Sequence, residues 1–398
     1  MVQAASVHSG DVLVMVGTKK GSFLLTSDAS REHWRLSGPY NPGAEVFHLA
    51  WEPRSSQLLA AANHAVWGPH VEYSNDLGAS WHAAKQDPAF PLPPELLNKI
   101  GGPTWNTSDQ PPRFAAEGET LKKVWHLEPG RVESAGTIYA GVEPAALFKS
   151  TDGGKTWQEV SGLTQHPSRS QWHPGAGGLC LHSIVPHPTD PKRMWVGISA
   201  AGVFGTSDGG KSWQPLNKGV RADFQPDRYP EFGQCVHKLL VHPARPETLY
   251  QQNHCGVYRS DDGGRQWHDI SEGLPSRFGY VLGLHSQDPD TLYVVPEDTA
   301  VGDEGGGINR YVSDAKFRVY RSRNKGQDWQ ALTHGLPQHN AYLHTLREGM
   351  ATDRLDPCGI YVGTVNGQVF YSRDDGDHWE TLIEYLLPIN SVSCSMVE

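Results

Sequence analysis

No stretch of this sequence is apolar for long enough to cross a bilayer. A transmembrane helix needs roughly 18 or more consecutive apolar residues, and the apolar runs here are much shorter. Residues 1–8 contain neither a basic region nor an apolar core, so no secretory signal is evident. We therefore expect a protein that does not interact with membranes.

Excess positive charge and paired cysteines are also missing. The 398 residues carry a net charge of −10 and the pI is near 6.0, which disfavours binding to nucleic acid or to an anionic membrane. The five cysteines are an odd number and lack the spacing of a disulfide framework. Such cysteines are typical of a reducing compartment, so we expect a cytoplasmic protein.

Several familiar enzyme signatures are absent. The sequence has no phosphate-binding loop, dinucleotide fingerprint, HExxH motif, GxSxG elbow or CxxC pair. Gly305-Gly306-Gly307 follows no strand-to-helix pattern and is interpreted as a flexible loop. Function must therefore be sought in the repeats and in the twenty histidines.

An eight-residue pattern recurs along the chain. Its clearest copy, STDGGKTW at residues 150–157, follows Ser/Thr-x-Asp-x-Gly-x-x-Trp. The Asp and Ser side chains can accept bonds from backbone N–H groups, the Gly tolerates positive φ, and the Trp covers the turn. Seven copies, some degenerate, end at Trp34, Trp81, Trp157, Trp213, Trp267, Trp329 and Trp379.

The spacing of these tryptophans predicts the fold. Successive tryptophans are 47 to 76 residues apart, and a blade of four short strands needs about 40–50 residues. We therefore predict an all-β protein in which residues 1–398 form one seven-bladed β-propeller domain.

The repeated turn resembles the Asp-box of the bacterial-neuraminidase (BNR) repeat proteins, which are propellers. They include sialidases, other glycosidases, sortilin-type receptors and photosystem-assembly factors, and this chain is also similar to glycosyl-hydrolase-like bacterial proteins without an assigned reaction. The resemblance implies the propeller fold and places the Asp-boxes away from the active face. Sialidases also carry a Phe/Tyr-Arg-Ile-Pro segment near the N-terminus, and none occurs here, so sialidase activity is not expected.

The two ends of the chain are predicted to share one blade. Residues 12–16 and 22–25 match the two middle strands at residues 360–370, so the first blade lacks its innermost strand. Residues 389–397 can supply it. Closure of the ring by both ends leaves no open sheet edge.

Histidine recurs in the predicted innermost strands, which would line the central channel. We place these strands at residues 46–51, 124–127, 180–185, 235–241, 280–284 and 342–346. Five of the six contain a histidine at a similar point. The predicted metal ligands are His48, His126, His182, His237 and His344.

Converging imidazoles can bind a divalent transition metal ion and leave positions open for substrate. Cys180 and Cys235 lie two residues before His182 and His237 and are either further soft ligands or packing residues. The alternative is that the five histidines line a wet channel and bind only water and backbone groups.

Blade geometry separates the loops onto two faces. The Asp-box turns and the turns that contain proline lie on one face, while the loops that enter the innermost strands lie on the other. The long insertions at residues 164–178, 217–234 and 296–317 are assigned to this second face, and residues 85–123 form a further long loop. Long loops are often functional, so we expect the site on the second face.

The candidate site residues are expected on this second face. The candidate catalytic residues are Glu143, His254 and Glu297. The candidate substrate-binding residues are His64, Trp172, His173, Arg221, Tyr229 and Asn253. Further carboxylates on the same face are Asp223, Asp227, Glu231 and Asp298, with Arg228 as a second possible anion ligand. Each of these residues can instead be a turn or loop anchor.

The sequence leads to three hypotheses about function. The first is a metal-dependent hydrolase, lyase or oxygenase that acts on a small polar molecule at the channel mouth. The second is a metal-free glycoside hydrolase or polysaccharide lyase, which needs two facing carboxylates. The third is a non-catalytic binding or assembly scaffold.

Overall fold

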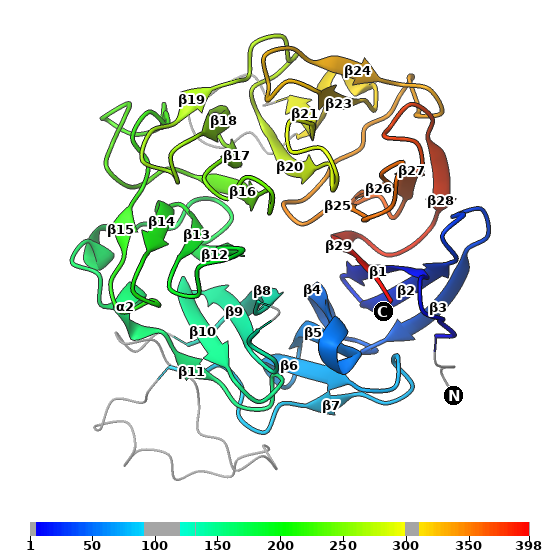
Figure 1. Cartoon of the computed structure of the whole chain (residues 1–398), viewed down its shortest axis with the longest axis horizontal. Helices are drawn as coiled ribbons and strands as arrows, with labels where there is room; N and C mark the ends of the chain where they lie inside the picture. Colours follow the sequence, from blue (N-terminus) through cyan, green and yellow to red (C-terminus); the bar gives the residue numbers. More distant parts are fainter. Residues whose placement is uncertain (1–4, 91–119, 132, 299–309, 398) are drawn as a thin grey trace.

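The computed structural model describes residues 5–90, 120–131, 133–298 and 310–397. Within these residues the chain forms seven antiparallel sheets arranged around a central axis (Figure 1). The predicted seven-bladed propeller is therefore confirmed. No helix in the described part of the chain is long and apolar enough to cross a membrane.

Each blade is numbered here by its order along the chain. Blade 1 contains β29 (Ile389–Met396), β1 (Val12–Thr18), β2 (Gly21–Ser27) and β3 (Arg35–Tyr40), and blade 2 contains β4 (Glu45–Glu52), β5 (Gln57–His64), β6 (Gly68–Ser74) and β7 (His82–Ala83). Blade 3 contains β8 (Lys123–Pro129), β9 (Ile138–Glu143), β10 (Ala146–Ser150) and β11 (Gln158–Glu159), and blade 4 contains β12 (Cys180–Pro186), β13 (Met194–Ser199), β14 (Gly202–Thr206) and β15 (Gln214–Pro215).

Blade 5 contains β16 (Val236–Val241), β17 (Leu249–Asn253), β18 (Gly256–Ser260) and β19 (His268–Asp269). Blade 6 contains β20 (Gly279–Leu284), β21 (Leu292–Asp298), β22 (Tyr311–Val312), β23 (Val319–Ser322) and β24 (Gln330–Leu332), and blade 7 contains β25 (Met350–Thr352), β26 (Ile360–Gly363), β27 (Val369–Ser372) and β28 (Glu380–Ile383). The short helices are η1 (Pro53–Ser55), α2 (Ser161–Thr164), η2 (Arg169–Gln171) and η3 (Ser313–Ala315).

Blade 1 closes the ring with strands from both ends of the described chain. β29 pairs with β1 from Val12 opposite Met396 to Thr18 opposite Ile389. The first and last strands of the described chain consequently lie side by side in this blade (Figure 1). The predicted closure is confirmed.

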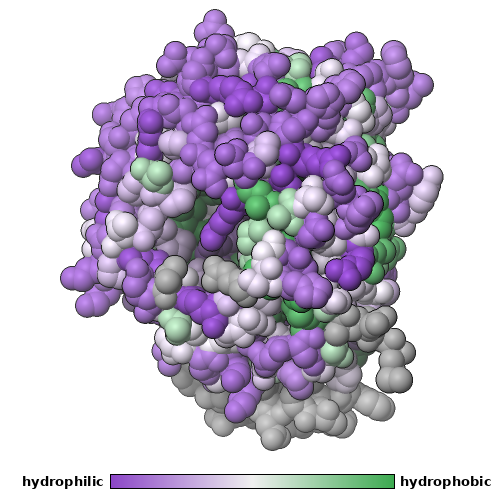
Figure 2. Space-filling model, turned by 45° about the vertical axis from the view of Figure 1, so that its right-hand side comes forward, coloured by the Kyte–Doolittle hydropathy of each residue, from purple (hydrophilic) through white to green (hydrophobic). Residues whose placement is uncertain are grey.

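The core lies between adjacent blades. One cluster joins blades 2 and 3, where Phe47 and Leu59 pack with Phe148 and Trp157. Burial of these apolar rings and chains stabilises one blade against the next. The outer surface seen in Figure 2 is largely hydrophilic, with apolar residues confined to small areas.

The repeated turn is held by side-chain bonds to its own backbone. The amides of Gly154 and Thr156 donate to Ser150 Oγ at 2.9 Å and to Asp152 Oδ1 at 2.9 Å. Trp157 is buried and donates from Nε1 to the carbonyl of Gly154 at 3.0 Å. The turn joins β10 and β11, the third and fourth strands of its blade.

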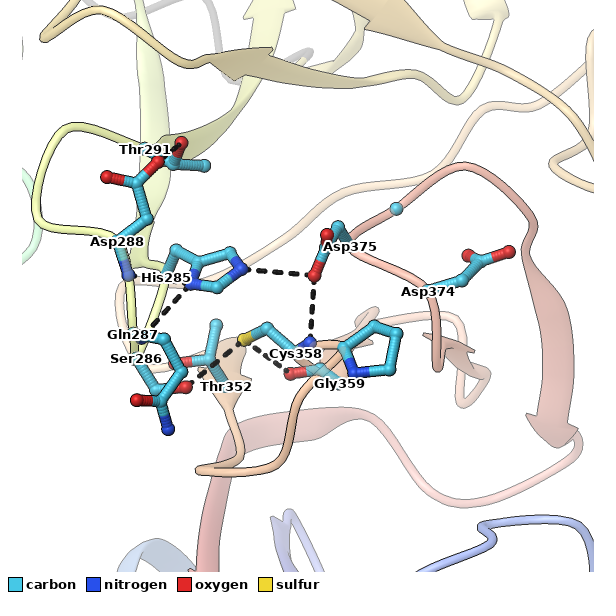
Figure 3. Close-up of polar contacts among 12 residues, drawn as sticks. His285, Ser286, Gln287, Asp288, Thr291, Thr352, Cys358, Gly359, Asp374 and Asp375 are labelled. Carbon is cyan, nitrogen blue, oxygen red and sulfur yellow. Dashed lines mark hydrogen bonds and ion pairs between the residues drawn. The ribbon is translucent and has the colours of Figure 1, made fainter.

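Some of these turns also join neighbouring blades. His285, which follows β20 of blade 6, lies 3.0 Å from Asp375 Oδ1 in the turn of blade 7 (Figure 3). The same Asp375 oxygen accepts from the amide of Cys358 at 2.8 Å. The turns therefore contribute to blade packing, on the face opposite the long loops.

The predicted innermost strand of blade 7 was wrong. The structure places this strand at β25 (Met350–Thr352), and residues 342–346 are not a strand. The turn that follows the innermost strand contains Pro357, so a strand that ends at residue 346 would be too far from it. Parts of two predicted insertions, residues 91–119 and 299–309, lie outside the described residues, as does Gly305-Gly306-Gly307.

Candidate functional site

A cavity of about 390 Å³ opens at the channel end where the long loops lie, and we name it the mouth cavity. It is formed by the beginnings of innermost strands, by the β1–β2 turn, by the end of β9 and by the loop before β12. Its lining residues are Lys19, Phe47, Lys123, Trp125, Glu143, Ala176, Gly177, Gly178, Leu346, Arg347, Glu348 and Asn390.

A second cavity of about 730 Å³ enters from the opposite face. It is lined by the far ends of β4, β8, β12 and β16 and by the proline turns at Pro53, Pro188 and Pro243. His48, His126 and Lys238 line this second cavity, whereas Glu348 lines the mouth cavity. We name these four residues the waist cluster, because they lie where the two cavities approach each other.

The waist cluster is a buried ionic network. Lys238 Nζ donates to Glu348 Oε2, and His126 Nδ1 lies 3.5 Å from Glu348 Oε1. Burial alone would raise the pKa of Glu348, but the charges of Lys238 and His126 outweigh it and hold this pKa well below 4.5. Burial lowers the pKa of His126, but Glu348 and Glu128 outweigh it and raise that pKa above 6.5.

The pKa of His48 is shifted in the opposite direction to that of His126. Burial, reinforced by the nearby His126, holds the pKa of His48 well below 6.5. The amide of Leu127 donates to His48 Nδ1 at 3.4 Å. A neutral His48 therefore carries its proton on Nε2, the atom that lies 3.9 Å from Glu348 Oε2.

β-Bulges decide which side chains face the channel. In β4 the paired residues skip Phe47, and in β8 they skip Trp125. His48 and His126 are the residues that follow the bulge, and both reach the waist cluster. In β16 the skipped residue is His237, so Lys238 takes the channel position.

For the same reason His182 does not belong to the waist cluster. It is the skipped residue of β12, and Ser183 follows it. A shift of one position along a strand turns a side chain to the other side. His182 and His237 lie six residues before their turn prolines, whereas His48 lies five and His126 three residues before theirs.

The expected cluster of five histidines is therefore wrong in its geometry. His182 bonds through Nε2 to the carbonyl of Val236 at 2.9 Å, and His237 through Nδ1 to that of Gly279 at 2.6 Å. His344 precedes β25 and does not lie on an innermost strand. Of the five, only His48 and His126 share a candidate metal-binding group, and their third partner is Glu348.

Glu143 is the second carboxylate of the mouth cavity. It is the last residue of β9, and its Oε2 accepts from Nε1 of Trp125 at 3.1 Å. Gly178 closes over its other oxygen, because a Cβ at this glycine would lie 2.5 Å from Glu143 Oε1. Gly178 also has a φ of +93°, which a side chain disfavours. The loop before β12 therefore approaches this carboxylate closely.

Three cations surround these carboxylates. Lys19, Lys123 and Arg347 all line the mouth cavity. Arg347 is partly exposed, its Nη2 donates to Ser199 Oγ at 3.3 Å, and its buried Nε has no hydrogen-bond partner. Within the described residues Arg347 makes no ion pair, so it can bind a negative group on a ligand.

The other candidate catalytic residues lie elsewhere. Glu297 is fully buried and accepts from the amide of Thr345 at 2.8 Å and from its hydroxyl at 2.6 Å. It also lies 2.7 Å from His344 Nδ1, so its oxygens are already bonded. This carboxylate anchors the segment before β25 and does not line the mouth cavity. His254 is half-buried between β17 and β18, beside Cys235 and His237.

Most candidate substrate-binding residues are loop anchors. Trp172 is 5% exposed and packs on Phe204, with ring centroids 4.8 Å apart. Asn253 is fully buried and accepts from the amide of Cys255 at 3.3 Å. Arg221 donates to the carboxylate of Asp223.

The remaining candidates are on the surface. His64 accepts from the amide of Val66 at 3.2 Å. His173 and Tyr229 are exposed, and Arg228 pairs with the Asp223 carboxylate at 3.0 Å. None of these side chains, nor the anchors Trp172, Asn253 and Arg221, lines the mouth cavity.

The sequence interpretation missed Trp125, Arg347, Glu348 and Lys238. A usable signal existed for blade 7, because Pro357 marks the turn and therefore places Arg347 and Glu348 just before the innermost strand. The role of Trp125 depends on a bulge, which the sequence pattern does not reveal.

Comparison with known families gives a partial match. Residues 145–303 match the family model described as sortilin, neurotensin receptor 3. Because this covers less than half of the chain, the match does not by itself assign the protein to that family.

Curated relatives of this chain include xyloglucanases. Xyloglucanase Xgh74A of Acetivibrio thermocellus is 24% identical over 284 residues, which cover 65% of this chain and 32% of that protein. An oligoxyloglucan-reducing end-specific xyloglucanase of Emericella nidulans is 30% identical over 222 residues, covering 48% of this chain and 25% of that one. The chain thus matches about a third or less of the length of these relatives.

A solved structure supports the fold. The GH74 enzyme of Niastella koreensis superposes with a TM-score of 0.55 at 16% identity, covering 99% of this chain and 53% of that one. At this identity the likeness concerns the fold alone.

Proposed function

We propose that this protein is a glycoside hydrolase whose active site is the mouth cavity. The observation that carries the proposal is that two carboxylates, Glu143 and Glu348, line one cavity beside the indole of Trp125. A pair of carboxylates is the usual machinery of glycoside hydrolysis, and aromatic rings commonly form the apolar wall of a ligand site. The similarity to xyloglucanases supports the same reaction class.

The two carboxylates have different environments. Lys238 and His126 keep Glu348 ionised, and its Oε1 has no hydrogen-bond partner. Glu348 is therefore assigned as the nucleophile or general base, and Glu143 as the general acid. Glu143 gives its proton to the glycosidic oxygen as the bond to the anomeric carbon breaks, and a water molecule supplies the new hydroxyl group. This assignment requires no metal ion.

The cavity also indicates the kind of substrate. A volume of about 390 Å³ lies near the lower end of the range for small-ligand sites, so it suits a chain end or a short oligosaccharide. Lys19, Lys123 and Arg347 favour a substrate that carries a carboxylate or another anionic group. The proposed substrates are therefore acidic oligosaccharides.

The test compares Glu143→Gln and Glu348→Gln with the parent protein on a panel of neutral xyloglucan oligosaccharides and uronate-containing oligosaccharides. Release of reducing ends is measured, and each variant is expected to lose about 10²–10⁴-fold in kcat. Glu133→Gln is the control, because Glu133 is exposed and lies outside the mouth cavity.

Two outcomes would contradict the proposal. Parent protein that binds an oligosaccharide in calorimetry without cleaving any member of the panel would be a binding protein. Products that carry an unsaturated non-reducing end, formed by elimination together with the new reducing end, would indicate a lyase. Product stereochemistry, followed by proton NMR, would show whether Glu348 acts as nucleophile or as base.

A further inference from the structure

A second cluster of side chains lies in blade 5, outside the mouth cavity. Cys235 directly precedes β16, His237 belongs to β16, and His254 lies in the turn between β17 and β18. One ligand atom from each of the three residues lies within 4.8 Å of the other two. The amide of His254 donates to the carbonyl of Cys235 at 3.0 Å, which fixes the turn against the start of the strand.

The bulge of β16 turns His237 toward this cluster. Val236 pairs with Asn253 and Lys238 with Gln252, so His237 is left out of the ladder. Its ring stacks on Tyr280, with centroids 4.6 Å apart and an interplanar angle of 25°. The side chain is 1% exposed, so its orientation is fixed by packing.

The protonation of His237 follows from its partners. The carbonyl of Gly279 can only accept, so Nδ1 of His237 carries the proton and donates at 2.6 Å. With the proton on Nδ1, the lone pair of Nε2 points toward Cys235 Sγ. A donor bond from Nδ1 to a carbonyl is the usual support for a histidine that binds a metal through Nε2.

The distance between ligand atoms suits a tetrahedral metal ion. His237 Nε2 lies 3.6 Å from Cys235 Sγ. Bond lengths of about 2.3 Å to sulfur and about 2.0–2.1 Å to nitrogen, at a tetrahedral angle, separate the two atoms by about 3.5 Å. One sulfur and two nitrogen ligands favour zinc-like ions over magnesium or calcium, which prefer oxygen.

We infer that Cys235, His237 and His254 form a binding site for a zinc-class divalent cation. His237 is buried, whereas Cys235 and His254 are partly exposed, so a fourth position is open to solvent or to a small ligand. Phe278 lies edge-on to both imidazoles, at 5.2 Å from His237 and 5.1 Å from His254, and forms an apolar wall.

One neighbouring charge opposes a cation here. Arg347 lies beside Cys235, and its positive charge also acts on His237. Coordination by the Cys235 thiolate supplies a compensating negative charge. The affinity of the site for a cation should therefore depend more on Cys235 than on either histidine.

The waist cluster is the weaker candidate for a metal. His48, His126 and Glu348 also lie within 4.8 Å of one another. However, the ammonium group of Lys238 already binds Glu348, and His48 keeps its proton on the nitrogen that would have to bind the ion. A lysine ammonium and a metal ion would compete for the same carboxylate.

The test uses cobalt(II) as a spectroscopic probe for zinc. The full chain is freed of metal with a chelator and titrated with cobalt(II), and we expect one ion per chain with a thiolate-to-cobalt charge-transfer band. Cys235→Ser should abolish this band. His254→Ala should weaken cobalt binding by more than about 100-fold. Loss of a residue that only hydrogen-bonds to a metal ligand typically weakens metal binding by about 10–100-fold.

Cys255→Ser is the matched control, because this buried thiol lies next to His254 but outside the cluster. The control should keep the charge-transfer band, and zinc should raise the melting temperature of the parent and of Cys255→Ser only. Circular dichroism shows whether each variant is folded. If Cys235→Ser does not fold, the loss of cobalt binding in His254→Ala provides the test. A band that survives in Cys235→Ser, or no binding of cobalt to the parent, would overturn the proposal. Neither readout depends on glycoside hydrolysis.

Discussion

Trp125 donates a hydrogen bond of 3.1 Å from its indole Nε1 to Oε2 of Glu143. The tryptophan is the bulged residue of β8 and the glutamate is the last residue of β9, so the bond joins neighbouring strands of blade 3. One aromatic side chain therefore both lines the mouth cavity and orients the carboxylate that we assign as the general acid.

Trp125→Phe should separate these two roles. Phenylalanine keeps an aromatic wall but removes the donor, so we expect kcat to fall about tenfold, equivalent to about 1.4 kcal/mol, with a small change in KM. Trp125→Ala should raise KM as well, because the apolar surface is lost. Steady-state kinetics on the best oligosaccharide provide the measurement. Equal kinetics for Trp125→Phe and the parent would show that the bond has no catalytic role.

Arg347→Met should change substrate preference. The guanidinium has no ion-pair partner among the described residues, so it is available for an anionic ligand. We expect the Kd for uronate-containing oligosaccharides to rise about 10- to 100-fold, and that for neutral ones to change by less than about twofold. Lys122→Met is the control, because Lys122 is exposed and does not line the cavity. A uniform loss for both substrate classes in calorimetry would argue for a structural role.

The ion pair of the waist cluster predicts a pH dependence of stability. The pKa of His126 is raised by folding, so its contribution is complete below 6.5 and is lost as pH rises through the folded value. The pKa of Glu348 is lowered, so its contribution is present above 4.5 and is lost as pH falls through the folded value. The ion pair between His126 and Glu348 should therefore stabilise the fold most at pH values between 4.5 and 6.5.

Urea unfolding of the parent and of His126→Gln from about pH 5 to about pH 8 tests this. The difference in unfolding free energy between the two proteins should be largest near the acidic end and should shrink toward the alkaline end. His173→Gln is the control, because this histidine is exposed. A difference that grows with pH would mean that His126 is neutral in the folded protein.

Asp152→Ala should weaken the fold without affecting the site. Asp152 accepts bonds from the amides of Lys155 and Thr156 and from the Thr156 hydroxyl. Their loss should lower the unfolding free energy by about 1–2 kcal/mol, with unchanged kcat per folded molecule. Thr151→Ala is the control, since this exposed residue is in the same turn. Loss of activity without loss of stability would place the active site on the opposite face.

The fold could be predicted from the sequence because it depends on local, repeated chemistry. Every copy of the turn keeps its terminal Trp and most copies keep the Asp and Gly, so the number of blades follows from the spacing of the tryptophans. The shared first blade follows from the match between residues 12–25 and residues 360–370. The innermost strand of blade 7 was misplaced because residues 342–346 are as apolar as a strand, and only the distance to Pro357 argues otherwise.

The candidate site could be predicted only in part. Glu143 was identified because it ends a middle strand on the loop face, but its partner Glu348 lies just after the misplaced strand at residues 342–346. The histidines looked equivalent because a sequence pattern does not show where a strand bulges. All four strands bulge, but His182 and His237 are themselves the bulged residues of β12 and β16, whereas His48 and His126 follow the bulge.

The pairing of β29 with β1 has a consequence for how the protein is made. These strands join residues at opposite ends of the described chain, so their contact closes a loop that contains six whole blades. The chain entropy lost in closing so long a loop is offset only when the preceding blades have stacked. Closure is therefore a late step in folding. During synthesis β1 is made before the other six blades and β29 after them. The edge of β1 therefore stays unpaired until the other blades have been translated, and in that interval the nascent chain is most exposed to aggregation and most in need of a chaperone.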